Sequence, residues 1–239
     1  MNTQVNLSKN ILSAGLGCLV IAVITVIWMA AGRAYSIDEA QPSVNSLSIE
    51  GLPLGKDYPY RSPLDITLST KDNLAYSAQH TGQCVDIISL KSKEIVHSIP
   101  LDGAPSGLAL DDMQNRLYVT YGLNPGNIAI IDTQSINIVF TLPAGSAPIA
   151  PVISADGKTL YICNRFDNEV VVYDLKTQKV RSRISVAREP IAAARTPDNT
   201  LLIVAHHLPA QAADKDHVAA AIDLIDTASL KIAASIRLP

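Results

Sequence analysis

The sequence predicts an all-β fold built from four-stranded antiparallel repeats, because three kinds of position recur about every 42 residues. An aromatic or apolar residue follows a turn, an Asp or Ser ends an apolar run, and a Pro precedes the next strand. The three sets are Tyr76, Tyr118, Tyr161 and Leu202; Ser89, Asp132, Asp174 and Asp226; and Pro63, Pro105, Pro148 and Pro190. Four short strands at this period are typical of β-propeller blades. We therefore expect β-propeller repeats over residues 62–239, with blades at 62–105, 106–148, 149–190 and 191–239.

The third repeat shows how this pattern maps onto strands. Its first apolar strand is followed by Asp156-Gly157, a pair that favours a hairpin turn. Gly adopts positive φ without strain, and the Asp side chain forms a hydrogen bond with the main chain of its own turn. A return strand is expected at 159–164, a β-branched strand covered on both faces at 170–173, and an outer strand at 180–186. One blade cannot bury both of its faces, so neighbouring blades must stack.

The repeats also carry a family resemblance. Tyr161-Ile162-Cys163-Asn164 and Tyr118-Val119-Thr120 resemble the Tyr-Val-Thr-Asn motif of the YVTN family of β-propeller repeat proteins. The resemblance covers roughly residues 62–239, with the motif, the Asp-Gly turn and the closing Asp-x-x-Thr/Ser in register. Residues 60–63 and 207–214 resemble a bacterial subgroup whose members often continue into more blades and a c-type cytochrome or peroxidase-like domain. This chain has no Cys-x-x-Cys-His motif for attaching haem.

The N-terminal segment predicts export. Residues 11–31 carry no charge and are bounded by Lys9 and Arg33. A length near 20 suits a membrane-spanning helix, whereas a signal-peptide core usually has about 7–15 residues. Gly32-Arg33-Ala34, with a small residue on each side of Arg33, also allows cleavage, so residues 1–34 are either a signal peptide or an N-terminal anchor in the inner membrane. Both alternatives place the repeats outside the cytoplasm, in the periplasm or at the cell surface, after a linker with one strand at 35–61.

Composition and motifs exclude several functions. The net charge of −3 and the lack of a Lys/Arg cluster argue against nucleic-acid binding. No Gly-x-Ser-x-Gly motif and no Gly-rich phosphate loop occur, so we predict no catalytic residue and no cofactor in this chain. Cys84 and Cys163 lie in different parts of different blades, too far apart for a disulfide, and are expected to be free thiols.

Only the fourth repeat, which carries an insert of about ten residues, gathers potential metal ligands. These weak candidates are His206, His207, Asp214, Asp216 and His217. Adjacent histidines on a strand point to opposite faces, so the first two cannot easily share an ion. We therefore favour a solvated loop over a metal site. The repeated Asp at strand ends likewise favours turn capping over ligation.

Strand counting predicts how the array ends. Four repeats supply sixteen strands that pair within their own blades, which leaves one broad face uncovered at each end. Rings of about six to eight blades close comfortably, whereas four need a tight wedge. We expect an incomplete propeller, an open arc that forms the N-terminal part of a longer one; a closed ring of four is the alternative.

Repeats without a catalytic constellation favour a non-catalytic extracytoplasmic scaffold. Its partner would be a protein or a small ligand on a face formed by blade loops. If the N-terminal segment is not cleaved, residues 11–31 also contact the membrane. The alternative is the propeller portion of a periplasmic redox protein, of the cytochrome c or peroxidase-like kind, whose haem domain is absent from this chain.

Overall fold

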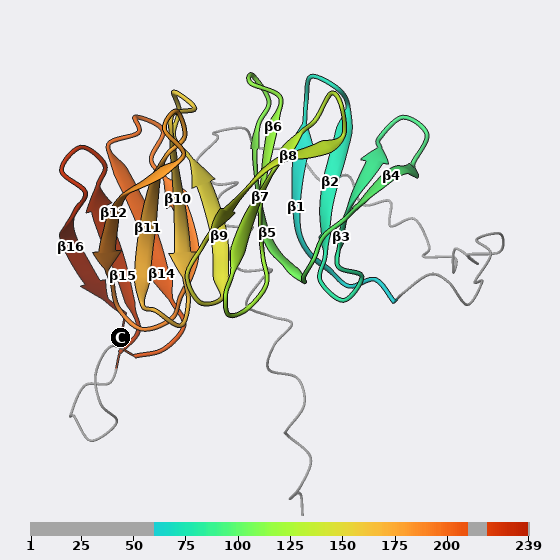
Figure 1. Ribbon diagram of the computed structural model, residues 1–239. Coiled ribbons are helices and arrows are strands. Elements are labelled where there is room, and N and C mark those ends of the chain that lie inside the picture. The colour runs from blue at the N-terminus through green and yellow to red at the C-terminus, as the bar shows by residue number, and fades with distance from the viewer. Residues whose placement is uncertain (1–59, 210–218, 239) are drawn as a thin grey trace, which may run out of the picture. The chain divides into compact units, whose positions relative to one another are not determined.

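The computed structural model describes residues 60–209 and 219–238, which lie within one compact unit, Leu54–Pro239. These residues form sixteen β-strands in four separate antiparallel sheets (Figure 1). The predicted all-β class and the strand number are therefore confirmed. The hydrophobic helix expected near the N-terminus falls outside the described residues. Within the described ranges, no helix has the length and apolar character that a bilayer crossing requires.

Each sheet is one blade, and its strands pair in chain order. Blade 1 contains β1 (Pro63–Ser69), β2 (Leu74–Gln79), β3 (Cys84–Ser89) and β4 (Glu94–Pro100). Blade 2 contains β5 (Pro105–Asp111), β6 (Arg116–Tyr121), β7 (Asn127–Asp132) and β8 (Asn137–Pro143). Blade 3 contains β9 (Pro148–Ile153), β10 (Thr159–Asn164), β11 (Glu169–Asp174) and β12 (Lys179–Ser185). Blade 4 contains β13 (Pro190–Arg195), β14 (Leu201–His206), β15 (Ala221–Asp226) and β16 (Lys231–Arg237).

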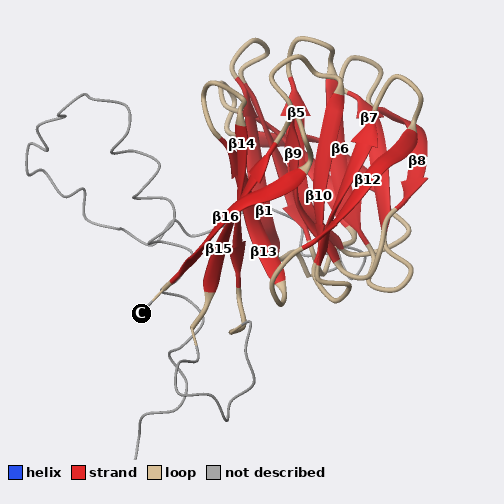
Figure 2. Cartoon of the chain, turned by 90° about the vertical axis from the view of Figure 1, so that its left-hand side faces the viewer, coloured by secondary structure: helices blue, strands red, loops and turns tan. Residues whose placement is uncertain are grey.

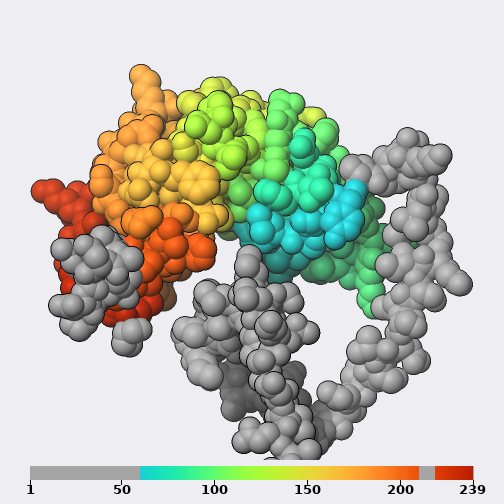
Figure 3. Space-filling view, turned by 90° about the horizontal axis from the view of Figure 1, so that it is seen from below, coloured from blue at the N-terminus to red at the C-terminus, as the bar shows by residue number. Residues whose placement is uncertain are grey.

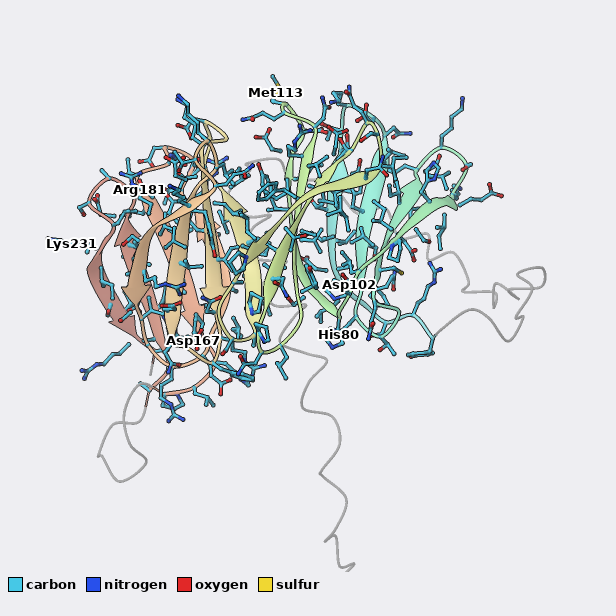
Figure 4. All side chains as sticks on the ribbon, viewed as in Figure 1. His80, Asp102, Met113, Asp167, Arg181 and Lys231 are labelled. Atoms are coloured by element: carbon cyan, nitrogen blue, oxygen red, sulfur yellow. The ribbon has the colours of Figure 1, made fainter. Side chains whose placement is uncertain are left out.

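The blades stand side by side in an arc. Each first strand contacts the first strand of the next blade, in the order β1, β5, β9 and β13. Seen from below, the colours run in chain order from blade 1 at one side to blade 4 at the other (Figure 3). The strands run between two rims of loops (Figure 2). Figure 4 places Met113 on the upper rim and both His80 and Asp167 on the lower rim.

Three hydrophobic clusters fill the three spaces between successive blades. The cluster between blades 2 and 3 is representative, with Tyr118 and Ile130 on one side and Leu160 and Tyr173 on the other. The second and third strands of the inner blades are buried on both faces, as the β-branched run at 170–173 predicts. Packing between blades, rather than within one blade, is therefore the main source of apolar burial.

The register of the fourth repeat differs from the prediction. Tyr76, Tyr118 and Tyr161 are each the third residue of their strand, and each faces the following blade. Leu202 is the second residue of β14 and faces the preceding blade instead. The residue that replaces Tyr is Ile203. Placing Leu202 in the Tyr set was wrong, because the Leu201-Leu202 pair reads equally well in either register, and a shift of one residue turns a side chain to the other face.

The repeated Asp residues cap the turns before the outer strands, as predicted. Asp132, Asp174 and Asp226 each accept the main-chain N–H of the third residue after them, at 2.7–2.8 Å. The hydroxyl of that residue also donates to the same carboxylate. These hydrogen bonds lower the pKa of all three carboxyl groups, since they favour the charged form.

Candidate functional site

The lower rim between blades 3 and 4 holds a buried polar cluster centred on Asp223. The side chains of His206 and Asp223 are 0% and 3% exposed, and His206 Nε2 lies 3.0 Å from Asp223 Oδ2 without the alignment of a hydrogen bond. Ser235 Oγ donates to Asp223 Oδ1 at 2.5 Å, and the Ala187 N–H donates to Oδ2 at 3.1 Å. The contacts of Asp223 therefore connect β14, β15 and β16 of blade 4 with the segment that precedes β13.

Burial sets the protonation of this cluster. It lowers the pKa of His206 because the charged imidazolium loses water, and this effect outweighs the opposing attraction of Asp223. His206 is therefore neutral at neutral pH. The other ring nitrogen of His206, Nδ1, is also buried and has no hydrogen-bond partner among the described residues.

A second set of charged residues lies at the surface between blades 3 and 4. Arg165 donates through Nε and Nη2 to Glu189 Oε2, at 2.8 and 2.6 Å. His207 Nδ1 lies 3.6 Å from the same oxygen. The hydrogen bond from Arg165 is the main cause of the lowered pKa of Glu189. These contacts connect the loop after β10, the loop before β13 and the end of β14.

The two predicted metal candidates that the structure describes, His206 and His207, point in different directions. His206 points into the interface, and His207, with a side chain 53% exposed, points to solvent. Asp214, Asp216 and His217 lie outside the described residues. In the part of the chain that the structure describes, no group of three or more His, Cys, Asp or Glu side chains is arranged to hold a metal ion.

The described thiols are poor nucleophiles. Cys84 and Cys163 are both buried and free, as expected from their places in separate blades. Burial raises the pKa of Cys163 to about 12, so its thiolate is scarce at neutral pH. Burial also raises the pKa of Cys84, with a further contribution from Asp86.

An open groove of about 510 Å³ lies between blades 2 and 3 near the upper rim. Its apolar wall includes Val139 and Phe140 of the outer strand β8, which are 48% and 44% exposed. Its polar wall combines side chains of both blades with the turns of blade 3. The main polar lining residues are Gln114, Arg116, Asp156, Lys158, Lys176 and Gln178.

The groove has an excess of positive charge. Lys158 Nζ lies 3.6 Å from Asp156, and Arg116 forms an ion pair with Asp132. Lys176 adds a cation from the turn before β12. Sequence reasoning missed this groove. A signal was present in Ile138-Val139-Phe140, a continuous apolar run in an outer strand where alternation is expected.

Comparisons with known proteins agree with this architecture. Residues 111–229 match the model of the family described as the cytochrome D1 heme domain. Hydrazine synthase of Kuenenia stuttgartiensis superposes with a TM-score of 0.67 at 20% identity, over 80% of this chain and 52% of that one. At this identity the structural likeness establishes the fold.

Curated relatives align with about half of the chain. YncE of Salmonella typhi and its counterpart from Salmonella typhimurium are each 28% identical over 135 residues, which is 56% of this chain and 36% of theirs. Antigen Lp49 of Leptospira interrogans is 26% identical over 121 residues, 45% of this chain and 26% of its own. The alignments therefore span about a third or less of the length of these relatives.

Together, the four repeated sheets and these similarities define a β-propeller repeat protein. Its repeats are of the YVTN type, as Tyr161-Ile162-Cys163-Asn164 predicted, and they are related to the repeats of YncE.

Proposed function

We propose that this chain is a non-catalytic, extracytoplasmic β-propeller scaffold that binds a partner segment in the groove between blades 2 and 3. The observation that carries the proposal is the pairing of exposed Phe140 and Val139 with cations from two turns. An exposed apolar strip beside a small net positive charge suits a negatively charged ligand that also has apolar side chains.

The outer strand suggests how such a ligand binds. β8 pairs with β7 on one side only, so its other edge carries main-chain groups able to pair with an added strand. In a peptide added there, every second side chain would face the groove, where both Phe140 and the cations Lys158 and Lys176 lie. We therefore expect an extended peptide whose groove-facing positions, every second residue, include both apolar and acidic side chains.

This binding has a matched test. The probe is a fluorescein-labelled peptide in which every second residue is Leu or Glu in turn, with Thr at the positions between, and its binding is followed by anisotropy. Lys176→Glu should raise its Kd at least fivefold, because it reverses a charge in the groove. Lys91→Glu is the control, since Lys91 holds the same hairpin position in blade 1, away from the groove. Equal effects of the two substitutions would contradict the proposed site.

The location rests on the uncharged residues 11–31, which support a cleaved signal or a membrane anchor. The test is a fusion after Leu238 to a phosphatase that is active only after export. We expect phosphatase activity, whereas cytoplasmic fluorescence from a matching fluorescent-protein fusion, without phosphatase activity, would contradict an extracytoplasmic location.

The match to the cytochrome D1 heme domain favours a second candidate, the propeller portion of a periplasmic redox protein. A haem needs an axial ligand such as His with space for the ring beside it. His206 is enclosed against Asp223 and does not fit this role. His97 lines an open groove of about 540 Å³ whose wall combines the apolar residues Ile99, Pro100, Ile136 and Ile138 with polar ones. His97 is therefore the residue through which this candidate is tested.

Titration with haemin separates the two candidates. The scaffold proposal includes no cofactor in this chain, so the absorbance should remain that of free haemin. A stoichiometric Soret shift that His97→Ala abolishes would favour the redox candidate.

A further inference from the structure

Each blade has two different faces, which are named here by the blade that they meet. The front face meets the next blade and carries the third residue of the second strand, as in Tyr118 and Tyr161. The back face meets the preceding blade and carries the second residue of that strand, as in Leu117 and Leu160. All three internal interfaces pack a front face against a back face.

The back face of blade 1 has the apolar character of an interface but is exposed. Leu64, Ile66 and Leu68 of β1 share this face, and Ile66 is 61% exposed. Leu108 occupies the place of Ile66 in β5 of blade 2, where it is 8% exposed against blade 1. The same position is therefore covered in one blade and exposed in another.

The back face of blade 1 also repeats a polar detail of an internal interface. Asp86 accepts a hydrogen bond from Ser98 at 2.6 Å, as Asp223 does from Ser235 at the equivalent positions of blade 4. In blade 4, Asp223 Oδ2 accepts the N–H of Ala187 across the interface. In blade 1 the partner is Arg61, which lies just before β1 and forms an ion pair with Asp86 through Oδ1. Oδ2 of Asp86 is buried without a hydrogen-bond partner among the described residues. The carboxylate of Asp86 is therefore already covered by this chain, and the exposed part of the face is its apolar part.

The front face of blade 4 is the complement. It carries Ile203, Leu224 and Ile236, of which the first two are partly exposed and the third is 49% exposed. At the places of Ile203 and Leu224, blade 3 has Tyr161 and Val172, both buried against blade 4. The four described blades thus present one apolar back face and one apolar front face that no other described blade covers.

We propose that two copies of this chain associate head to tail through these faces. The front face of blade 4 in one copy packs on the back face of blade 1 in the other, and the second junction repeats the first. Two arcs of four blades then close into a ring of eight, within the usual range for propellers. The second copy is the occupant that the observations favour, because it supplies both complementary faces at once in the pairing that all internal interfaces use.

The test uses the full chain in a mild detergent, with molecular mass measured by light scattering. The wild type should have twice the 25.5 kDa mass of one chain. Ile66→Asp blocks the back face and Leu224→Asp blocks the front face, and each variant alone should have the mass of one chain. An equimolar mixture should recover a two-chain species, because one unaltered front face can still pack on one unaltered back face. Val139→Asp, on the outer strand β8, is the control and should leave the mass at two chains.

The mixture also shows that both variants are folded, since a misfolded chain could not restore the pair. A wild type with the mass of one chain would overturn the proposal and assign the end faces to another part of the polypeptide or another protein. A variant that still pairs alone would show a front-to-front or back-to-back contact instead. A mass that neither variant changes would assign association to the N-terminal segment. Loss of pairing in the Val139→Asp control would place the contact at the outer strands.

Discussion

Leu160→Ala tests whether packing between blades stabilises the fold. Leu160 is fully buried in the cluster between blades 2 and 3. The substitution removes three carbons, each worth about 0.8 kcal/mol on burial, which amounts to about 2.4 kcal/mol. The cavity left between two twisted sheets raises the expected loss to about 3–4 kcal/mol. For a unit of this size the melting temperature should fall by about 6–16 °C.

Urea unfolding followed by circular dichroism measures this loss. The only tryptophan, Trp28, lies before the blades, so its fluorescence would not report on them. The midpoint should fall while the slope of free energy against urea stays constant, which identifies a change in stability. Leu123→Ala is the control, because the same three carbons are removed from a side chain that is 63% exposed. If the two substitutions lowered the free energy of unfolding equally, interblade packing would not be the main source of stability.

Three further substitutions test the turns and the buried cluster. Asp174→Ala should lower the melting temperature at neutral pH, and the gap should close as the pH falls through the lowered pKa of this carboxyl, since its hydrogen bond to the Thr177 N–H needs the charged form. The pKa of His206 is lowered in the folded protein, so as the pH falls the unfolded chain binds this proton before the folded chain does. At pH values below about 6.5, the free energy of unfolding should therefore decrease by up to about 1.4 kcal/mol per pH unit. His206→Gln should remove this dependence in urea unfolding, whereas it should persist in His97→Gln, at an exposed site. Gly157→Ala should cost at least about 1 kcal/mol by the same measurement, because φ is +67° and the added carbon would lie 2.1 Å from a Gln114 side-chain atom.

The sequence was sufficient to predict the blades because their repeated positions have simple physical causes. Each Pro starts a first strand, and the Asp residues cap turns, so both sets mark boundaries directly. The error at Leu202 arose where two similar residues, Leu201 and Leu202, stand side by side and the distinguishing aromatic residue is missing. Because both residues are apolar, the sequence alone does not specify which of them points toward the preceding blade.

The two polar and charged sites were harder to predict. Asp223 appears in sequence as one polar residue in an apolar strand, and its role depends on His206 and Ser235 from neighbouring strands. A comparison of equivalent positions would have been informative, since the third residue of the third strand is Asp in blades 1 and 4 (Asp86 and Asp223) but Ala129 in blade 2. The groove required knowledge of how blades 2 and 3 pack, because its lining residues come from strands and turns of both.

The difference between inner and outer blades determines the order in which parts of the chain unfold locally. Blades 2 and 3 have neighbours on both faces, whereas blades 1 and 4 each have one within the described array. In a nearest-neighbour array, main-chain amides at the ends exchange with solvent through local opening, and central ones only through larger unfolding. In a single, unpaired chain, such as the Ile66→Asp variant is expected to give, the amide of Val171 should therefore exchange far more slowly than that of Leu224. A ligand held between blades 2 and 3 would rest on the slowest-opening part of the chain, and fraying of either outer blade would leave its site intact.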